Sequence, residues 1–66
     1  MNSYKALTKL RMEKGLNYRE MAEILDISRV FYWQIENGKR TLTYAMAKKI
    51  AKVFNQKPDQ IFYEES

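Results

Sequence analysis

The chain has 66 residues, a length that allows one domain and lies near the lower limit for folding without a disulfide or a metal. It contains no cysteine and no histidine, which excludes a disulfide framework, a zinc finger, a cysteine nucleophile and a histidine general base. Apolar residues (45%) and charged residues (30%) occur in globular proportions, and two glycines and one proline are too few for a many-stranded barrel. We therefore expect an all-helical protein that is not an enzyme and needs no cofactor or metal.

The net charge of +4 is unevenly distributed along the chain. Residues 27–57 carry seven basic residues against one acidic residue, a local excess of +6, whereas residues 58–66 carry three acidic residues and no basic one. A basic middle segment is expected where one face of a protein meets a polyanion. An ordinary solvated surface would give the same count, so charge alone leaves both interpretations open.

The sequence gives no sign of a membrane or secretory segment. No run of 18 apolar residues occurs, and the first residues lack an apolar core followed by a cleavage site. We expect a cytoplasmic protein that has no membrane contact and no evident small-molecule ligand.

Helix signals begin near the start of the chain and recur with short gaps. Tyr4, Leu7 and Leu10 are spaced for a first amphipathic helix, and Gly15 occupies the position of a left-handed cap. Asn17 precedes a glutamate by three residues, the pattern of a capping box at the start of a second helix. The residues that this second helix is expected to bury are Met21, Ala22 and Leu25.

Three further helices complete the prediction. Ser28 is a suitable N-cap for a third helix that continues to about Asn37, where Gly38 provides the stop. The fourth is capped by Thr43 at its start and by Asn55 at its end, and Pro58 fits the first position of a fifth. The sequence therefore predicts five short helices around one core, in a single domain over residues 1–66 with a frayed tail at residues 63–66.

The third predicted helix has two different faces. At about 100° per residue, Tyr32 and Ile35 fall on the side that packs against the second helix. The residues on the opposite side are Arg29, Val30, Trp33, Gln34 and Asn37. A tryptophan and a valine on an outward face are more typical of a surface that meets a partner than of a solvated surface.

The runs Leu10–Leu16, Met21–Ser28 and Gln34–Arg40 together resemble the helix-turn-helix domain of phage repressors and Cro, the Xre-like regulators. The similarity covers residues 5–62. It implies a lambda-repressor-like DNA-binding domain, in phage or bacteria, whose third helix enters the major groove of DNA.

The resemblance also implies roles for individual residues. Those matching positions that approach base edges are Ser28, Arg29, Val30, Trp33 and Gln34. Arg29 would bond bidentately to guanine, Gln34 to adenine, and Val30 would touch a thymine methyl. Those matching positions that hold phosphates are Asn17, Tyr18, Asn37, Gly38, Lys39 and Arg40.

Other matched positions have structural roles, and some residues depart from the family pattern. Arg11 and Glu36 match a pair that forms an internal salt bridge in relatives. Tyr18 replaces a glutamine that frequently binds phosphate, and Asp26 stands in the turn where glycine is usual. Tyr32 occupies an inward position usually held by a branched aliphatic residue, so its hydroxyl needs a partner or the solvent edge.

The function that this resemblance implies is a sequence-specific transcriptional regulator, a repressor, that binds double-stranded DNA. One domain of this size covers only about 600–1,000 Å² of DNA interface. We therefore expect a homodimer on a palindromic operator, with a dimer contact formed by Ile61, Phe62 and Tyr63. The alternative is a protein-interaction module of the same fold, antitoxin-like or adaptor-like, with an apolar patch formed by Val30, Phe31 and Trp33.

Overall fold

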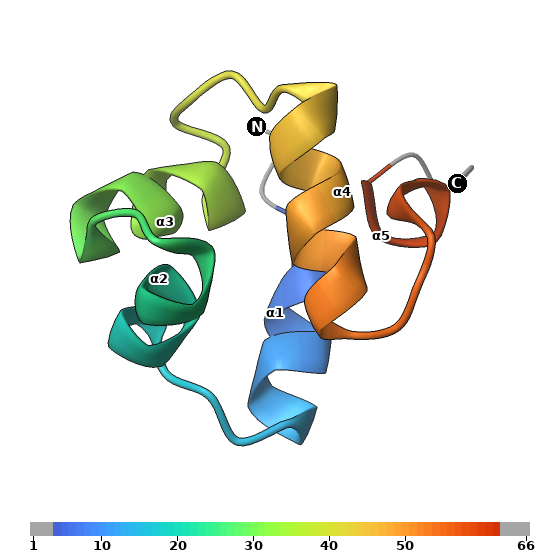
Figure 1. The fold of residues 1–66 in the computed structure, drawn as a ribbon, viewed down its shortest axis with the longest axis horizontal. Helices are drawn as coiled ribbons and strands as arrows, with labels where there is room; N and C mark the ends of the chain where they lie inside the picture. Colours follow the sequence, from blue (N-terminus) through green and yellow to red (C-terminus); the bar gives the residue numbers. More distant parts are fainter. Residues whose placement is uncertain (1–3, 63–66) are drawn as a thin grey trace.

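A computed structural model describes residues 4–62 of the chain. It contains five α-helices in this part of the sequence, which confirms the predicted all-α fold (Figure 1). Their bounds are α1 (Lys5–Glu13), α2 (Tyr18–Leu25), α3 (Arg29–Glu36), α4 (Tyr44–Val53) and α5 (Pro58–Phe62). The predicted frayed tail and Tyr63 lie outside the described residues.

Side chains cap the starts of the three central helices as the sequence predicted. Asn17 accepts a hydrogen bond from the Glu20 backbone N–H (2.8 Å), and the Glu20 carboxylate accepts one in return from the Asn17 N–H (2.9 Å). At the start of α3 the Ser28 hydroxyl accepts a hydrogen bond from the backbone N–H of residue 31. At the start of α4 the Thr43 hydroxyl accepts one from the backbone N–H of residue 46. Each cap satisfies a backbone donor that has no partner within its helix.

Residues with positive φ separate the helices. Asp26 (φ 61°) ends α2 in the left-handed conformation, which a short polar side chain tolerates better than most. It is followed by two further residues before α3 begins, so α2 and α3 are joined by a three-residue turn. Gly38 (φ 71°) ends α3 and turns the chain toward the connection to α4.

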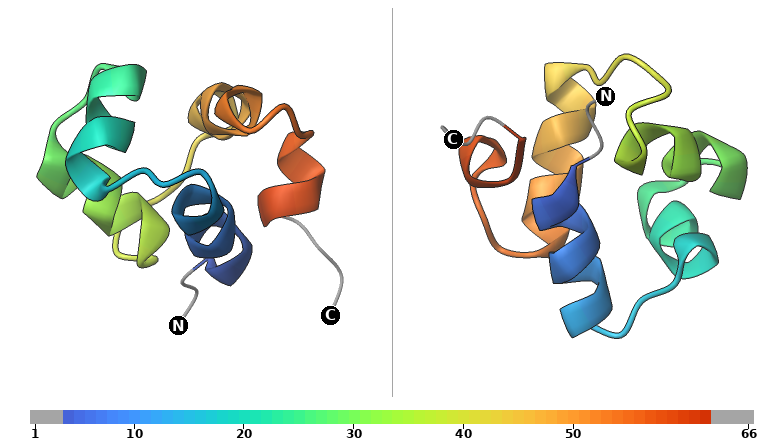
Figure 2. Two further views of the ribbon diagram at one scale, coloured as in Figure 1. Left: turned by 90° about the horizontal axis from the view of Figure 1, so that it is seen from below. Right: turned by 180° about the vertical axis from the view of Figure 1, so that it is seen from behind.

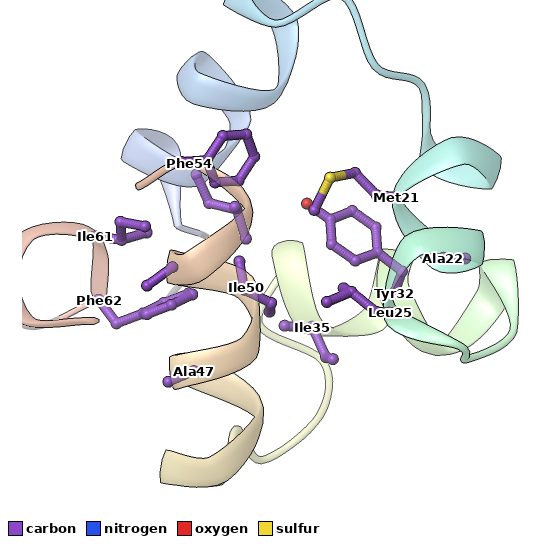
Figure 3. Packing of buried hydrophobic residues seen from close by; sticks show 12 residues of the cluster. Met21, Ala22, Leu25, Tyr32, Ile35, Ala47, Ile50, Phe54, Ile61 and Phe62 are labelled. Atoms are coloured by element: carbon purple, nitrogen blue, oxygen red, sulfur yellow. The ribbon is translucent and has the colours of Figure 1, made fainter. Parts of the chain in front are cut away.

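One hydrophobic core holds the five helices together (Figure 3). Met21 of α2, Tyr32 of α3 and Ile50 of α4 are all completely buried, so the core extends across the whole bundle. The remaining buried apolar residues are Leu7, Ala22, Leu25, Ile35, Ala47, Ala51, Phe54, Ile61 and Phe62. Tyr4, the N-cap of α1, packs edge-to-face on Phe62 at 4.9 Å between ring centroids, which ties the start of α1 to α5.

The helices are arranged so that α2 and α3 form a unit at one side of the molecule. In Figures 1 and 2 this pair lies to one side of α1 and α4, and α5 lies on the other. The free face of α3 is therefore turned away from α5. Among residues 4–62, no helix combines the length and the apolarity needed to cross a bilayer.

Candidate nucleic-acid interface

The inner face of α3 fixes this helix rigidly against the domain. Tyr32 and Ile35 are at most 1% exposed, as the helical periodicity predicted, and α3 packs on α2 more extensively than on any other helix. Burying these side chains leaves the opposite face of α3 toward solvent. A short helix held in this way can present a fixed set of side chains to a partner.

The outer face of α3 carries cationic and apolar groups side by side. Arg29 is exposed, and large fractions of Val30 (61%) and Trp33 (40%) remain accessible. These three residues and Tyr18 line a shallow groove between α3 and the start of α2. An adjoining hollow is lined by Asn17, Tyr18, Arg19 and Arg29. The structure thus brings Asn17 and Tyr18 close to Arg29, Val30 and Trp33, whereas Ser28 and Gln34 line neither hollow.

A second cationic element follows α3. Lys39 and Arg40 are exposed beside Gly38, and the three residues line a polar hollow with Tyr4, Thr41 and Leu42. The side-chain amide of Asn37, which was predicted to hold phosphate, donates one N–H to the Trp33 carbonyl oxygen (2.9 Å). Asn37 therefore closes the end of α3 in this structure.

Gln34 and Arg40 contact each other across the end of α3. The Arg40 Nε donates to the Gln34 Oε1 (3.0 Å), and the Arg40 guanidinium lies over the Phe31 ring, 4.2 Å from its centroid. Phe31 is partly buried against the core. Of the predicted apolar patch, Val30 and Trp33 line one groove, and the Phe31 ring is covered by Arg40.

A buried ion pair connects α1 to the end of α3, as the resemblance implied. Arg11 donates to Glu36 through Nε (2.9 Å) and Nη2 (3.0 Å), and its Nη1 donates to the Leu16 carbonyl oxygen (2.9 Å). The Tyr32 hydroxyl donates to Glu36 Oε1 (2.7 Å), so the inward tyrosine has the partner that its position requires. Thr8 donates to Glu36 Oε2 (2.7 Å) and completes the set of donors.

These contacts keep Glu36 ionised. Burial alone would raise the pKa of its carboxyl group, but hydrogen bonds from Arg11, Tyr32 and Thr8 outweigh burial and hold the pKa below its ordinary value. Burial and the hydrogen bond to Glu36 raise the pKa of Tyr32. The hydrogen bond to Glu36 raises the pKa of Arg11 against the opposing effect of burial.

The ion pair also affects the charge of the surface. Glu36 is the acidic residue of the segment 27–57, and it is only 2% exposed and paired with Arg11. All the exposed charged side chains of this segment are therefore basic. An anionic partner approaching α3 and the following loop meets no carboxylate from residues 27–57.

Two predicted contact sites have other roles within the domain. Tyr18 is partly buried, and the Arg11 guanidinium lies over its ring, with 4.4 Å between the Arg11 Cζ and the ring centroid. Tyr18 also lines the groove beside α3, so it remains part of the candidate surface. Ile61 (4% exposed) and Phe62 (9%) belong to the core. Because so little of either side chain is exposed to solvent, neither is well placed for the dimer contact that the sequence predicted.

Sequence reasoning did not single out Thr8 or Arg19. Thr8 lies three residues before Arg11 on the same face of α1, a spacing that could have indicated a shared partner. Arg19 lines the same hollow as Arg29, although the two lie on different helices. The packing of α2 on α3 brings Arg19 close to Arg29, and no sequence pattern indicates this.

The three-residue turn between α2 and α3, together with the free face of α3, defines this protein as a helix-turn-helix domain. The helix-turn-helix domain family matches residues 4–65, and the chain belongs to this Xre-type family.

Known proteins resemble the chain in sequence and in fold. Over 46 residues it is 44% identical to the uncharacterized HTH-type transcriptional regulator YqaF of Bacillus subtilis (strain 168), a match that covers 70% of this chain and 60% of YqaF. The fold resembles the crystal structure of the clp gene regulator ClgR from Corynebacterium glutamicum, with a TM-score of 0.75 and 22% identity over 83% of this chain and 58% of ClgR. The chain thus spans about three fifths of the length of either protein.

Proposed function

We propose that this chain is a sequence-specific transcriptional regulator, a repressor, that binds double-stranded DNA by placing α3 in the major groove. The observation that carries the proposal is the outer face of α3, where Arg29, Val30 and Trp33 are exposed on a rigidly packed helix. Membership of the helix-turn-helix family and the name of the relative YqaF support it.

The proposed contacts divide into base-reading and phosphate-binding groups. Arg29 has no ion-pair or hydrogen-bond partner for its side chain within residues 4–62, so its guanidinium is free to bond to guanine O6 and N7. Val30 and Trp33 supply apolar contacts to thymine methyls and sugars. Ser28 lies at the N-terminal end of α3, where helices of this type contact base edges.

Phosphates are held at both ends of this surface. Asn17, Tyr18 and Arg19 offer donors at the start of α2, and Lys39 offers an ammonium after α3, where the Gly38 backbone N–H donates to the Ile35 carbonyl oxygen (3.2 Å). Such contacts fix the position of the protein on the duplex without reading the sequence.

The active species that we propose is a homodimer on a palindromic operator. A single module covers about 600–1,000 Å² of DNA interface, and two modules related by a two-fold axis double this area. Their α3 helices would lie in successive major grooves, with half-sites about 10 bp apart.

The salt dependence of binding tests this function. Fluorescence anisotropy with a labelled duplex should show an affinity that falls steeply as salt rises, with a slope of about −0.9 for each phosphate contact in a plot of log K against log salt. The second candidate, a protein-interaction module, is favoured by the exposed Val30 and Trp33. It predicts a duplex affinity too weak to measure at physiological salt, and that result would overturn the DNA-binding proposal.

A further inference from the structure

We infer that Gln34 and Arg40 act together as one base-reading unit that recognises guanine at one position of each half-site. This inference rests on the proposed function and goes beyond it, because it assigns a base to a pair of side chains. It also makes Arg40 a residue that determines specificity rather than one that only holds phosphate.

The geometry of the pair restrains Arg40 on two sides. Its Nε donates to Gln34 Oε1 at 3.0 Å, and its Cζ lies 4.2 Å from the centroid of the Phe31 ring. Phe31 and Gln34 are three residues apart on α3, so they are neighbours on the helix surface. Stacking on an aromatic ring and an in-plane hydrogen bond together orient the guanidinium before any DNA arrives.

The chemistry of the two groups fixes the orientation of the Gln34 amide. A guanidinium carries N–H donors and no acceptor, so the amide atom that faces Arg40 must be the oxygen. The amide NH2 of Gln34 is then directed elsewhere. The pair therefore offers the two N–H groups of the Gln34 amide and the N–H groups on the two terminal nitrogens of Arg40, and its one remaining acceptor is the second lone pair of the Gln34 oxygen.

A unit in which donors predominate distinguishes the base pairs in the major groove. Guanine presents two acceptors there, N7 and O6, whereas adenine presents one acceptor and one amine, and cytosine presents an amine. Thymine offers the single acceptor O4. Guanine is accordingly the base that satisfies the unit best.

This assignment differs from the adenine contact that the sequence suggested for Gln34. A glutamine binds adenine through both atoms of its amide, the oxygen accepting from N6 and the nitrogen donating to N7. In this structure the Arg40 Nε–H takes one lone pair of that oxygen and orients the amide. Removing Arg40 should release the amide from this orientation and change the preferred base from guanine to adenine.

Selection from a pool of random duplex DNA provides the test. The full chain and the variant Arg40→Ala would each be used to retain duplexes, and the retained sequences compared at every operator position. Lys39→Ala is a matched control, because Lys39 is the adjacent exposed cation and its side chain has no hydrogen-bond partner within the described residues. Circular dichroism would establish that each variant is folded.

The expected result is a change at one position of each half-site. Arg40→Ala should shift the preference there from guanine toward adenine by about 5- to 150-fold, the discrimination of one bidentate contact. Lys39→Ala should weaken binding to all sequences without changing any preferred base. In a Gln34→Ala background the preference at that position should be lost, and Arg40→Ala should then have no base-dependent effect.

Two results would overturn the inference in distinguishable ways. If the unaltered protein enriches an operator and Arg40→Ala weakens every sequence equally, Arg40 is a phosphate contact and the paired unit does not exist. If the unaltered protein enriches no sequence, the proposed function itself fails and the inference fails with it.

Discussion

Replacing Glu36 with glutamine keeps the size of a buried side chain and removes its charge. The carboxylate accepts from Arg11, Tyr32 and Thr8 in the described structure, and it is 2% exposed. The glutamine amide offers one oxygen acceptor, and its NH2 group would face donors that can only donate, such as the guanidinium of Arg11. The variant therefore leaves a buried cation without its counter-charge.

The expected loss is large for a domain of this size. Breaking a buried ion pair from one side costs about 3–5 kcal/mol. At about 0.05–0.15 kcal/mol per residue, a chain of 66 residues has a free energy of unfolding of roughly 3–10 kcal/mol. Glu36→Gln should therefore lower the melting temperature by at least about 12 °C or unfold the domain at room temperature.

Thermal and urea unfolding followed by circular dichroism would measure this loss. The matched control is Glu23→Gln, because Glu23 is exposed and its carboxylate has no hydrogen-bond or ion-pair partner within residues 4–62. The control should change the free energy of unfolding by less than about 0.5 kcal/mol. If the two variants differ by less than about 1 kcal/mol, the ion pair does not stabilise the domain as argued.

The pH dependence of stability provides a second test of the role of Glu36. The pKa of Glu36 is lower in the folded than in the unfolded chain, so its contribution to stability is fully present above the unfolded pKa of about 4.3. That contribution is lost as the pH falls through the folded pKa. The stability of the unaltered protein should thus decrease below about pH 4 more steeply than that of any folded Glu36→Gln variant. Parallel pH profiles would contradict a lowered pKa for Glu36.

Three further substitutions test separate parts of the structure. Tyr32→Phe removes one hydrogen bond to a buried carboxylate and should reduce the free energy of unfolding by about 1–3 kcal/mol, measured by urea unfolding; an unchanged midpoint would show that the hydroxyl contributes nothing. Asp26→Ala should cost about 1 kcal/mol in the same assay because φ is 61°, and Asp26→Gly should not; equal losses would contradict a conformational cause. Arg29→Ala should lose about 1–3 kcal/mol of binding at one base position, whereas Lys39→Ala should weaken all sequences and reduce the salt slope by about one; equal losses on every duplex from both would contradict base reading by α3.

Most of the fold could be predicted because its signals are local. The capping residues Asn17, Ser28 and Thr43 act within three residues of their own positions, and all three caps are present in the structure. The burial of Tyr32 and Ile35 follows from helical periodicity alone. Such features need no knowledge of how distant parts of the chain pack.

The parts of the site that sequence reasoning could not supply depend on tertiary packing. The contact between Arg40 and Gln34 requires the path of the chain after Gly38, which no periodicity fixes. Similarly, Ile61 and Phe62 are apolar enough for either a dimer contact or a core, and only the packing of α5 on α1 and α4 distinguishes these roles. The sequence shows which residues are apolar or charged, but tertiary packing determines which of their side chains are exposed and can contact a partner.

Selection of random duplex DNA by the unaltered protein at physiological salt is the decisive measurement for base reading by α3. We expect an enriched palindrome whose half-sites lie about 10 bp apart, because two α3 helices related by a two-fold axis would enter successive major grooves. Retention of duplexes with no enriched sequence, or no retention at all, would contradict base reading by the exposed face of α3.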